Sequence, residues 1–252
     1  MKKLRLDQAL VERKLAPSRA RARDAIKRGG VCVDGSPATK ASQMVSDTAQ
    51  LTLNDPASAY VSRAALKLIH ALDQFGFEPA GKTCVDIGAS TGGFCQVLLE
   101  RGASEVFGVD VGHDQMHARL VNHPRLHVLE GVNARHLDTG HIPIPFSGLV
   151  SDVSFISLRL ALPPALAMAS EGAFAALLVK PQFEVGKDGI GKGGLVRDPT
   201  EGTATAERLA MWLDSPSEPL TKGWRALDLV PSPILGGDGN KEYLLGAIKD
   251  RC

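Results

Sequence analysis

The sequence predicts an α/β protein in which a small basic domain precedes a mostly parallel sheet. From Val61 onward, apolar runs of strand length alternate with runs of helical periodicity, a pattern typical of a parallel sheet covered on both faces. Residues 1–40 contain eleven Lys and Arg against four Asp and Glu, a net charge of +7, whereas the remaining residues carry −6. A basic segment on an acidic body indicates a module that binds a polyanion.

The amino-terminal segment contains the start and stop signals of short elements. Helical spacing predicts a first helix over residues 4–11, and Ser18 is the expected N-cap of a second, which Gly29-Gly30 ends. Residues 31–33 and 50–53 are predicted strands, and Asp34-Gly35 a tight turn. Residues 54–58 have linker composition, so we expect domains at 1–58 and 59–252. The basic side chains in and around the second helix are the predicted RNA contacts: Arg19, Arg21, Arg23, Lys27 and Arg28.

The rest of the chain supplies the alternating elements of the sheet domain. Strands are predicted at 83–87, 105–109, 126–129, 148–153 and 174–179, with helices at 62–75, 93–101, 113–121 and 158–169. Residues 225–230 and 242–248 follow one another closely and predict an antiparallel closing pair.

Composition makes several classes of protein improbable. The four cysteines form no CxxC pair and are expected to be free thiols. The longest clean apolar run, residues 174–179, is far shorter than the ~20 residues that span a bilayer, and no signal peptide is visible. We therefore expect a cytoplasmic protein with no membrane partner. His113 and His117 lie four residues apart but have no evident third ligand, so no metal site is expected.

A glycine-rich stretch, DIGASTGGF at residues 86–94, follows a predicted strand and opens a helix. The first strand–helix turn is where open parallel sheets bind nucleotides, and glycines let a ligand approach the backbone closely. The stretch is not GxGxxG, and the acid followed by small residues suits the amino-acid tail of S-adenosylmethionine (SAM) better than a pyrophosphate. Asp110 ends the second strand, where a carboxylate can accept two hydrogen bonds from a ribose diol.

Polar residues also follow the fourth and fifth predicted strands. Asp152 lies in SDVSF and Lys180 in VKPQFE, each directly after an apolar run. Because parallel-sheet enzymes place their sites at the carboxyl ends of strands, we expect these two side chains to face each other.

These motifs, with YVSRAALKL, VDVG, SDVSFISL, VKPQFEVGKDGIGKGGLVRDP and GNKEYLL, resemble the TlyA family of FtsJ-like ribosomal RNA 2′-O-methyltransferases. The resemblance covers nearly the whole chain, including SRARARDAIKRGGVCVDG, which resembles an S4-type (alpha-L) RNA-binding domain. It implies SAM-dependent methylation of cytidine ribose in ribosomal RNA of one or both subunits. It also implies a catalytic tetrad of Lys67, Asp152, Lys180 and Glu242. The SAM contacts it implies are Asp86, Gly88, Ser90, Gly92, Gly93, Asp110 and Asn133.

One departure and three alternatives accompany this resemblance. Ala64 and Leu66 stand where relatives often have Gly and an aromatic residue or His, which leaves Lys67 in place beside an altered surface. A nicotinamide-dependent oxidoreductase needs a similar turn but lacks support without GxGxxG. A non-catalytic RNA-binding assembly factor does not need the full tetrad. A membrane-lytic toxin, the third alternative, has no cationic amphipathic helix with an aromatic face to support it.

Overall fold

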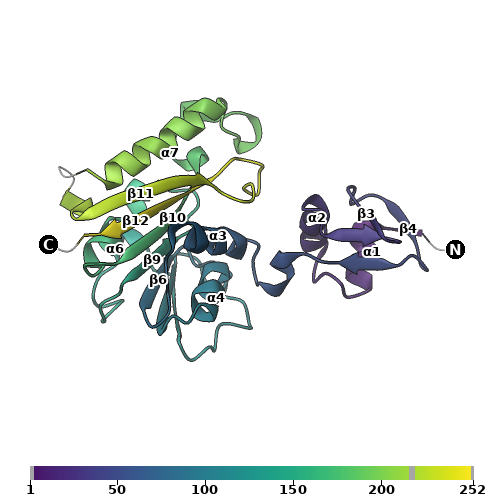
Figure 1. The fold of residues 1–252 in the computed structure, drawn as a ribbon, viewed down its shortest axis with the longest axis horizontal. Helices are drawn as coiled ribbons and strands as arrows, with labels where there is room; N and C mark the ends of the chain where they lie inside the picture. Colours follow the sequence, from purple (N-terminus) through teal and green to yellow (C-terminus); the bar gives the residue numbers. More distant parts are fainter. Residues whose placement is uncertain (1–2, 216–218, 251–252) are drawn as a thin grey trace. The chain divides into compact units, whose positions relative to one another are not determined.

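The computed structural model describes residues 3–215 and 219–250, and the chain divides into two compact units. Unit 1 comprises residues 1–60 and unit 2 residues 61–252. The predicted α/β class, with a large sheet after a small basic module, is confirmed. Figure 1 shows both units, and each is described here by itself.

Unit 1 packs two helices with short strands. Leu6, Leu10, Ile26 and Val31 lie in its core with almost no exposed surface. Strand β1 pairs antiparallel with β4, and β2 lies between β3 and β5. The helix predicted from residue 4 begins two residues later, because residues 3–5 pair with 44–46 instead. The elements are β1 (Lys3–Arg5), α1 (Leu6–Glu12), α2 (Arg19–Lys27), β2 (Val31–Val33), β3 (Ser36–Pro37), β4 (Met44–Ser46), β5 (Leu51–Leu53) and the 3-10 turn η1 (Pro56–Ala59).

Unit 2 is built on one sheet in the order β11-β12-β10-β9-β6-β7-β8. The five strands from β8 to β10 in that order run parallel, and β12 and β11 close one side antiparallel, as predicted. The chain winds outward from β6 to β8, then returns to β9 on the other side of β6. The strands are β6 (Thr83–Ile87), β7 (Glu105–Asp110), β8 (Leu126–Glu130), β9 (Gly148–Ser151), β10 (Phe174–Val179), β11 (Trp224–Pro231) and β12 (Tyr243–Lys249).

Helices cover this sheet, and four of them differ from the sequence prediction. Helix α3 starts at Ala65 instead of residue 62, and the predicted helix 158–169 is divided at Pro163 into α5 and α6. Helix α7, capped by Asp198, lies along β11 and was not predicted (Figure 1). The helices are α3 (Ala65–Phe75), α4 (Gly93–Glu100), α5 (Leu158–Ala161), α6 (Pro163–Met168) and α7 (Pro199–Leu213). The 3-10 turns are η2 (Ala134–His136), η3 (Pro181–Phe183), η4 (Lys187–Gly189), η5 (Lys192–Gly194) and η6 (Pro219–Thr221).

The helix predicted over residues 113–121 is wrong, because this stretch is an irregular loop between β7 and β8. The Glu130 carboxylate, at the end of β8, accepts backbone N–H bonds from Asp114, Gln115 and Met116. These bonds lower the pKa of Glu130. A side chain distant in sequence thus satisfies N–H groups in a non-helical conformation.

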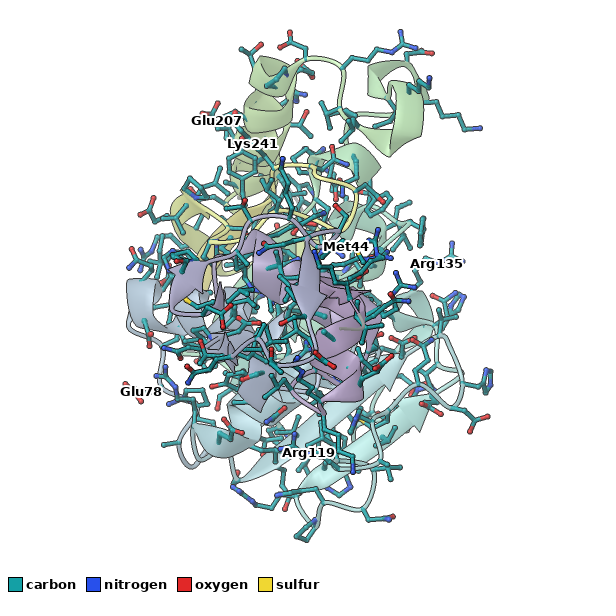
Figure 2. All side chains as sticks on the ribbon, turned by 90° about the vertical axis from the view of Figure 1, so that its right-hand side faces the viewer. Met44, Glu78, Arg119, Arg135, Glu207 and Lys241 are labelled. Atoms are coloured by element: carbon teal, nitrogen blue, oxygen red, sulfur yellow. The ribbon has the colours of Figure 1, made fainter. Side chains whose placement is uncertain are left out.

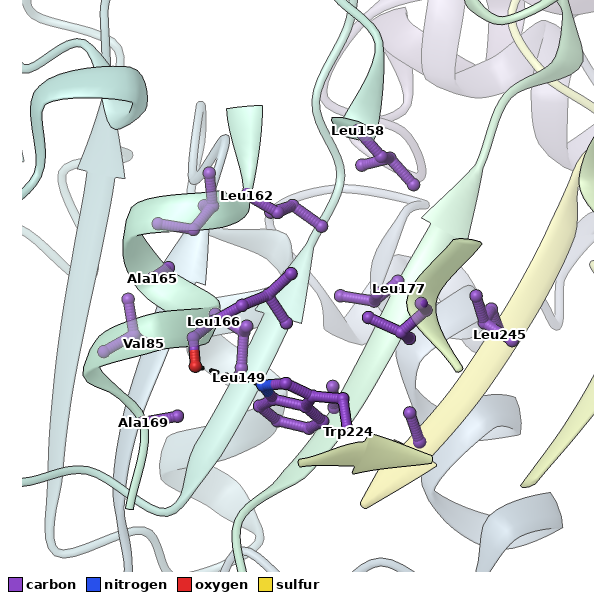
Figure 3. Packing of buried hydrophobic residues seen from close by; sticks show 14 of the residues in the cluster. Val85, Leu149, Leu158, Leu162, Ala165, Leu166, Ala169, Leu177, Trp224 and Leu245 are labelled. Atoms are coloured by element: carbon purple, nitrogen blue, oxygen red, sulfur yellow. Dashed lines mark hydrogen bonds between the residues drawn. The ribbon is translucent and has the colours of Figure 1, made fainter. Parts of the chain in front are cut away.

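One core cluster of unit 2 lies between the sheet and helices α5, α6 and α7. Figure 3 shows Leu149, Leu177 and Leu245 from neighbouring strands packed together, with Trp224 donating its indole N–H to the Leu166 carbonyl at 3.0 Å. Charged side chains such as Glu78 and Glu207 point outward (Figure 2). Of the helices within residues 3–215 and 219–250, none has the length and apolar character to cross a membrane.

Candidate active site

Strand register brings the predicted tetrad positions to one edge of the sheet. Ile87 pairs with Ser151, and Ser151 pairs with Leu177, so the residues that follow β6, β9 and β10 emerge at the same edge. Val179 pairs antiparallel with Tyr243. Lys180 and Glu242, each one residue further, therefore lie at opposing positions just beyond the last pair.

The larger cavity at this edge, about 560 Å³, lies where the chain reverses its direction of winding, between β6 and β9. Open α/β sheets bind ligands at such a switch point. The cavity is large enough for a nucleoside-sized ligand. Its wall includes four of the predicted cofactor residues: Gly88, Ser90, Asp110 and Asn133.

A second cavity of about 150 Å³ adjoins the first. Gly88, Ser90, Asp152 and Ser154 line both cavities and so form their common wall. Lys180 lines only the smaller one. The arrangement thus provides a large compartment for a cofactor beside a small compartment that contains the lysine.

Asp110 is held at the rim of the larger cavity by backbone bonds. Its Oδ2 accepts the N–H of Ser90 at 2.8 Å and its Oδ1 accepts the N–H of Gly112 at 2.8 Å. A carboxylate has about four acceptor sites, so both oxygens can still accept from a diol. Asn133 lies on the facing loop, where its Oδ1 accepts the N–H of Arg135. The exposed Arg135 side chain (Figure 2) also donates from its Nε to this oxygen at 3.4 Å.

Asp86 lies in β6, two residues before Gly88, and lines neither cavity. It has no exposed surface, and the Cys95 thiol donates to its Oδ2 at 3.0 Å. Its Oδ1 has no hydrogen-bond partner among the described residues. Burial raises the pKa of Asp86 to about 7, and the Asp152 and Asp110 carboxylates act in the same direction.

At two glycines of the glycine-rich turn, a side chain would clash with neighbouring atoms. Gly88 has φ +86°, and a Cβ there would lie 2.9 Å from the Asp152 carbonyl oxygen. Gly92, also left-handed, would meet the Met116 sulfur. Gly88 thus keeps the wall between the cavities thin, whereas Gly92 lines neither cavity and serves packing. Gly93 lines the smaller cavity.

Lys180 is fixed by an ion pair and a hydrogen bond. Its Nζ lies 2.6 Å from Asp152 Oδ1 and donates to Ser154 Oγ at 2.7 Å. The Lys180 and Asp152 side chains are 11% and 15% exposed, so the pair is mostly shielded but reachable. An ammonium has three donors, and the hydrogen bond to Ser154 takes one of them. A remaining N–H can bind an oxygen atom in the smaller cavity.

Lys67 and Glu242 form a separate, deeper ion pair. Lys67 Nζ lies 2.6 Å from Glu242 Oε2, and the side chains are only 6% and 2% exposed. Helix α3 packs on β12 and so brings the lysine to the strand end. The structure therefore brings the four tetrad residues to one edge as two lysine–carboxylate pairs.

The loop after β9 contacts the loop after β10 through two hydrogen bonds and one aromatic pair. Glu184 accepts from Ser157 Oγ at 2.6 Å and from the N–H of Leu158 at 2.8 Å, and burial raises the pKa of Glu184. The Phe155 and Phe183 rings contact each other at 5.1 Å between centroids. Phe155 is 90% exposed and has φ +65°, a strained conformation for an aromatic residue. Such a residue at the cavity wall is typical of a functional loop.

The basic loop of residues 186–197 is anchored by Asn240. The buried Asn240 side chain accepts the N–H of Val196 at 3.0 Å and donates to the Gly194 carbonyl at 2.9 Å. Asn240 lies two residues before Glu242, so one turn holds both the loop and the buried lysine pair.

Four of the five predicted RNA contacts in unit 1 have partners within that unit. Arg19 and Arg23 donate to Asp7, Arg21 donates to the carbonyls of Ala57 and Tyr60, and Arg28 pairs with Asp55 at 2.6 Å. Lys27 is exposed. The helix thus presents guanidiniums fixed by internal acceptors, not an array of freely solvated cations.

Several site residues escaped the sequence prediction. The larger cavity also includes Gln115 and Arg135, while Ser154, Glu184 and Asn240 position its surroundings. They lie in loops without periodicity. Glu130, which organises the loop after β7, had one detectable signal: like Asp110, it is an acid that ends a strand, and the two pair in register. Among the described residues, no group of three His, Cys, Asp or Glu could hold a metal ion.

Comparison with known proteins identifies both units. Residues 60–249 match the model of the FtsJ-like methyltransferases, and residues 4–51 match the S4 domain. The chain belongs to the FtsJ-like methyltransferase family. The two cavities and the two lysine pairs all lie within this methyltransferase domain.

Relatives match over almost the full length of the methyltransferase. The 16S/23S rRNA (cytidine-2′-O)-methyltransferase TlyA of Mycobacterium tuberculosis is 44% identical over 97% of this chain and 89% of its own. Hemolysin A of Brachyspira hyodysenteriae is 36% identical over 96% of this chain and 98% of its own. A solved structure from Streptococcus thermophilus, provisionally designated a hemolysin, is 34% identical and covers 99% of this chain and 90% of its own, with a TM-score of 0.74.

Proposed function

We propose that this methyltransferase transfers a methyl group from SAM to the 2′-hydroxyl of a cytidine in ribosomal RNA. The observation that carries the proposal is the pair of adjoining cavities, with Lys180 and Asp152 at the smaller one. The M. tuberculosis relative is named for this reaction on 16S and 23S RNA, which supports the substrate class. Ribosomal subunits are then the partner and the cytoplasm the location.

The larger cavity fits SAM on three grounds. It has nucleoside size, Asp110 offers carboxylate oxygens at its rim, and Gly88 lets a ligand approach the backbone. We assign cofactor contacts to Gly88, Ser90, Asp110 and Asn133. Gly93 is assigned to the wall of the smaller cavity. Asp86 and Gly92 line neither cavity and are assigned to the packing of the glycine-rich loop. When bound, SAM supplies an activated methyl group on a sulfonium.

Lys180 is assigned to the oxygen that attacks. A ribose hydroxyl becomes a good nucleophile as it loses its proton, so the enzyme must stabilise the negative charge that develops on oxygen. As an ammonium, Lys180 can donate a remaining N–H to that oxygen; as a neutral amine, it can accept the proton. Asp152 and Ser154 fix its position in either case. Lys67 and Glu242 are assigned a supporting role, because their ion pair is almost fully buried.

The two units divide the work in this proposal. Residues 1–58 bind RNA through the arginine-rich helix α2, and residues 59–252 carry out the transfer. The exposed Phe155, at the wall of the larger cavity, is suited to stack on a nucleotide base. The basic loop held by Asn240 lies on the same sheet edge and supplies Lys187, Lys192 and Arg197 for phosphate contacts.

The direct test supplies the full chain with radiolabelled SAM and separately purified 30S and 50S subunits. We expect label in ribosomal RNA, and digestion to nucleosides followed by mass spectrometry should identify 2′-O-methylcytidine. Lys180→Ala serves as the matched inactive control. Label on a base instead of a ribose, or binding to subunits without any methyl transfer, would contradict the proposal; the second outcome would favour an assembly factor.

A further inference from the structure

The segment that follows β9 has little backbone support of its own. Residues 152–157 connect β9 to α5 without regular secondary structure. They include Asp152 and Ser154, the two groups that contact Lys180. At the start of the segment, the Asp152 N–H donates to a carbonyl of β6 at 3.0 Å. In the part of the chain that the structure describes, residues 153–157 donate no N–H to another backbone carbonyl. Side-chain contacts must therefore hold this segment in place.

The far end of the segment is held by Glu184, which directly follows the turn η3. Its Oε2 accepts from Ser157 Oγ at 2.6 Å, and its Oε1 accepts the N–H of Leu158 at 2.8 Å. Ser157 Oγ in turn accepts the N–H of Arg159 at 3.1 Å and so caps α5. Glu184 thus fixes the segment where it enters α5, and both of its carboxylate oxygens are engaged.

Glu184 and Lys180 belong to the same short turn. Only the three residues of η3 separate them, and Pro181 opens this turn with a restricted φ. The Glu184 N–H donates to the Pro181 carbonyl at 3.0 Å, and the Phe183 N–H donates to the Lys180 carbonyl at 2.9 Å. The position of the carboxylate is therefore coupled to that of the lysine.

A general contribution to stability does not explain why a carboxylate stands at this position. Burial raises the pKa of Glu184, so its carboxylate lies where water solvates it poorly. The charge of Arg159 lowers this pKa, but the Arg159 guanidinium donates to the Arg208 carbonyl instead of the carboxylate. Glu184 lines neither cavity, so it has no direct contact with a ligand bound there. What the side chain provides is geometry, because its two acceptors engage an O–H and an N–H at once.

We propose that Glu184 is a positioning residue for methyl transfer, which holds the segment 152–157 so that Asp152 and Ser154 orient Lys180 in the smaller cavity. The proposal rests on the proposed function and assigns part of it to a residue outside the tetrad. Without Glu184, the segment keeps its attachment to β9 but loses its anchor at α5. A reacting group displaced by about 1 Å can lose about 10²-fold in rate.

The test measures single-turnover methylation by the full chain over a range of ribosomal subunit concentrations. Glu184→Ala should lower the plateau rate about 10- to 100-fold, while the half-saturating subunit concentration stays within a few-fold. SAM affinity, measured by calorimetry, should also stay within a few-fold and verifies that unit 2 is folded. Glu207→Ala makes the same change at an exposed position of α7 and should keep the original rate. A normal plateau for Glu184→Ala would overturn the proposal.

Two conservative variants separate geometry from charge and guard against misfolding of Glu184→Ala. Glu184→Gln keeps the length of the side chain; its carbonyl can accept the Leu158 N–H, and its amide can donate to Ser157 Oγ. It should recover most of the rate. Glu184→Asp keeps the charge but shortens the reach by one methylene, so it should lower the plateau about 3- to 10-fold. A role of charge alone would reverse this order. The reversed order, or equal rates for the two variants, would contradict the proposal.

A double variant tests whether Glu184 acts through Lys180. If it does, Glu184→Ala should slow the Lys180→Ala enzyme by no more than about 2-fold, because the group that it positions is already absent. Slowing by the same factor in both backgrounds would show that the two residues act independently and would rule out the positioning role.

Failure of the proposed function has a different signature. If the original protein transfers no methyl group to subunits, or if Lys180→Ala keeps the original rate, the proposed function fails and the positioning role fails with it. If the original protein methylates subunits and Lys180→Ala does not, but Glu184→Ala matches the original protein, only the assignment of Glu184 is wrong.

Discussion

In unit 1, three arginines (Arg5, Arg19 and Arg23) share the buried carboxylate of Asp7, whereas at the sheet edge of unit 2 each lysine has a carboxylate of its own. The first arrangement leaves a surplus of positive charge on the surface, which suits a polyanion that must be held. The second is balanced, so each lysine is fixed in place by its own carboxylate, and the two pairs add no net charge. We therefore propose that clusters of cations and carboxylates serve binding in unit 1 and chemistry in unit 2.

The largest effect on stability is expected at the Lys67–Glu242 pair, which is more deeply buried than the Lys180–Asp152 pair. Lys67→Met leaves the Glu242 carboxylate buried without a partner and should lower the free energy of unfolding by about 3–5 kcal/mol, measured by urea denaturation. The double variant Lys67→Met/Glu242→Leu should recover most of that loss but no activity. Arg101→Met breaks the exposed Arg101–Asp73 pair and should cost no more than about 1 kcal/mol. Equal losses of unfolding free energy in Lys67→Met and Arg101→Met would contradict the greater importance of the buried pair.

Asp86 provides a buried carboxylate with no cation beside it, and its effect should depend on pH. Its pKa is about 7 in the folded chain against an ordinary value of 3.8. As pH rises from about 4 to about 7, the unfolded chain loses this proton while the folded chain keeps it, so the stability contributed by the group falls through that window. We expect Asp86→Asn to gain about 2–4 kcal/mol relative to the original protein between pH 4.5 and 7.5.

The measurement for Asp86 is the urea midpoint as a function of pH. Asp188→Asn makes the same chemical change at an exposed position of unit 2 and should leave the original pH profile in place. An Asp86→Asn profile parallel to that of the original protein would show that Asp86 is ionised throughout.

Asp110 should contribute to cofactor binding. Asp110→Ala removes a charge-assisted, bidentate contact to a ribose diol worth about 1.5–3 kcal/mol, or roughly 10- to 150-fold in SAM affinity. Titration calorimetry measures the change, and the affinity for ribosomal subunits should stay within a few-fold. Unchanged SAM affinity would remove Asp110 from the cofactor site.

Ser154 should have the smallest effect. Ser154→Ala removes the hydroxyl that accepts a hydrogen bond from Lys180 and should lower the single-turnover rate about 3- to 10-fold, with subunit affinity unchanged. Ser154→Thr keeps the hydroxyl and should restore much of the rate. Ser104→Ala, on the opposite edge of the sheet, is the matched control. If Ser154→Thr were as slow as Ser154→Ala, the hydroxyl would not be the feature that matters.

The position of the candidate site could be predicted from the sequence, because its residues lie at the ends of strands. Asp152 and Lys180 directly follow apolar strands, and parallel strands deliver their ends to one edge. The loop of residues 111–125 could not be predicted, because its conformation depends on the distant carboxylate of Glu130. Helical spacing alone there favoured a helix that the structure does not contain.

The arginines of unit 1 show the same limit. The sequence identified a basic helix, but the partners of its arginines lie 12 to 39 residues away, at Asp7, Asp55, Ala57 and Tyr60. Local composition predicts where charge lies, whereas tertiary contacts decide which charges are neutralised. The division into surplus and balanced charge therefore became visible only in the folded chain.

The division of labour between the units is tested most directly by single-turnover methylation measured over a range of subunit concentrations. Two variants are compared with the original protein: Lys180→Ala, and the double variant Arg19→Glu/Arg23→Glu. SAM affinity, measured by calorimetry, is the control for the fold of unit 2 and should stay within a few-fold in both.

The account predicts opposite signatures for the two variants. Lys180→Ala should lower the plateau rate by about 10²- to 10⁴-fold while the half-saturating subunit concentration stays within a few-fold, and Lys180→Arg should restore little. The arginine double variant should raise the half-saturating concentration at least 10-fold and leave the plateau nearly unchanged. A near-normal plateau for Lys180→Ala, or normal half-saturation for the arginine variant, would contradict the assignment of chemistry to unit 2 and of binding to unit 1.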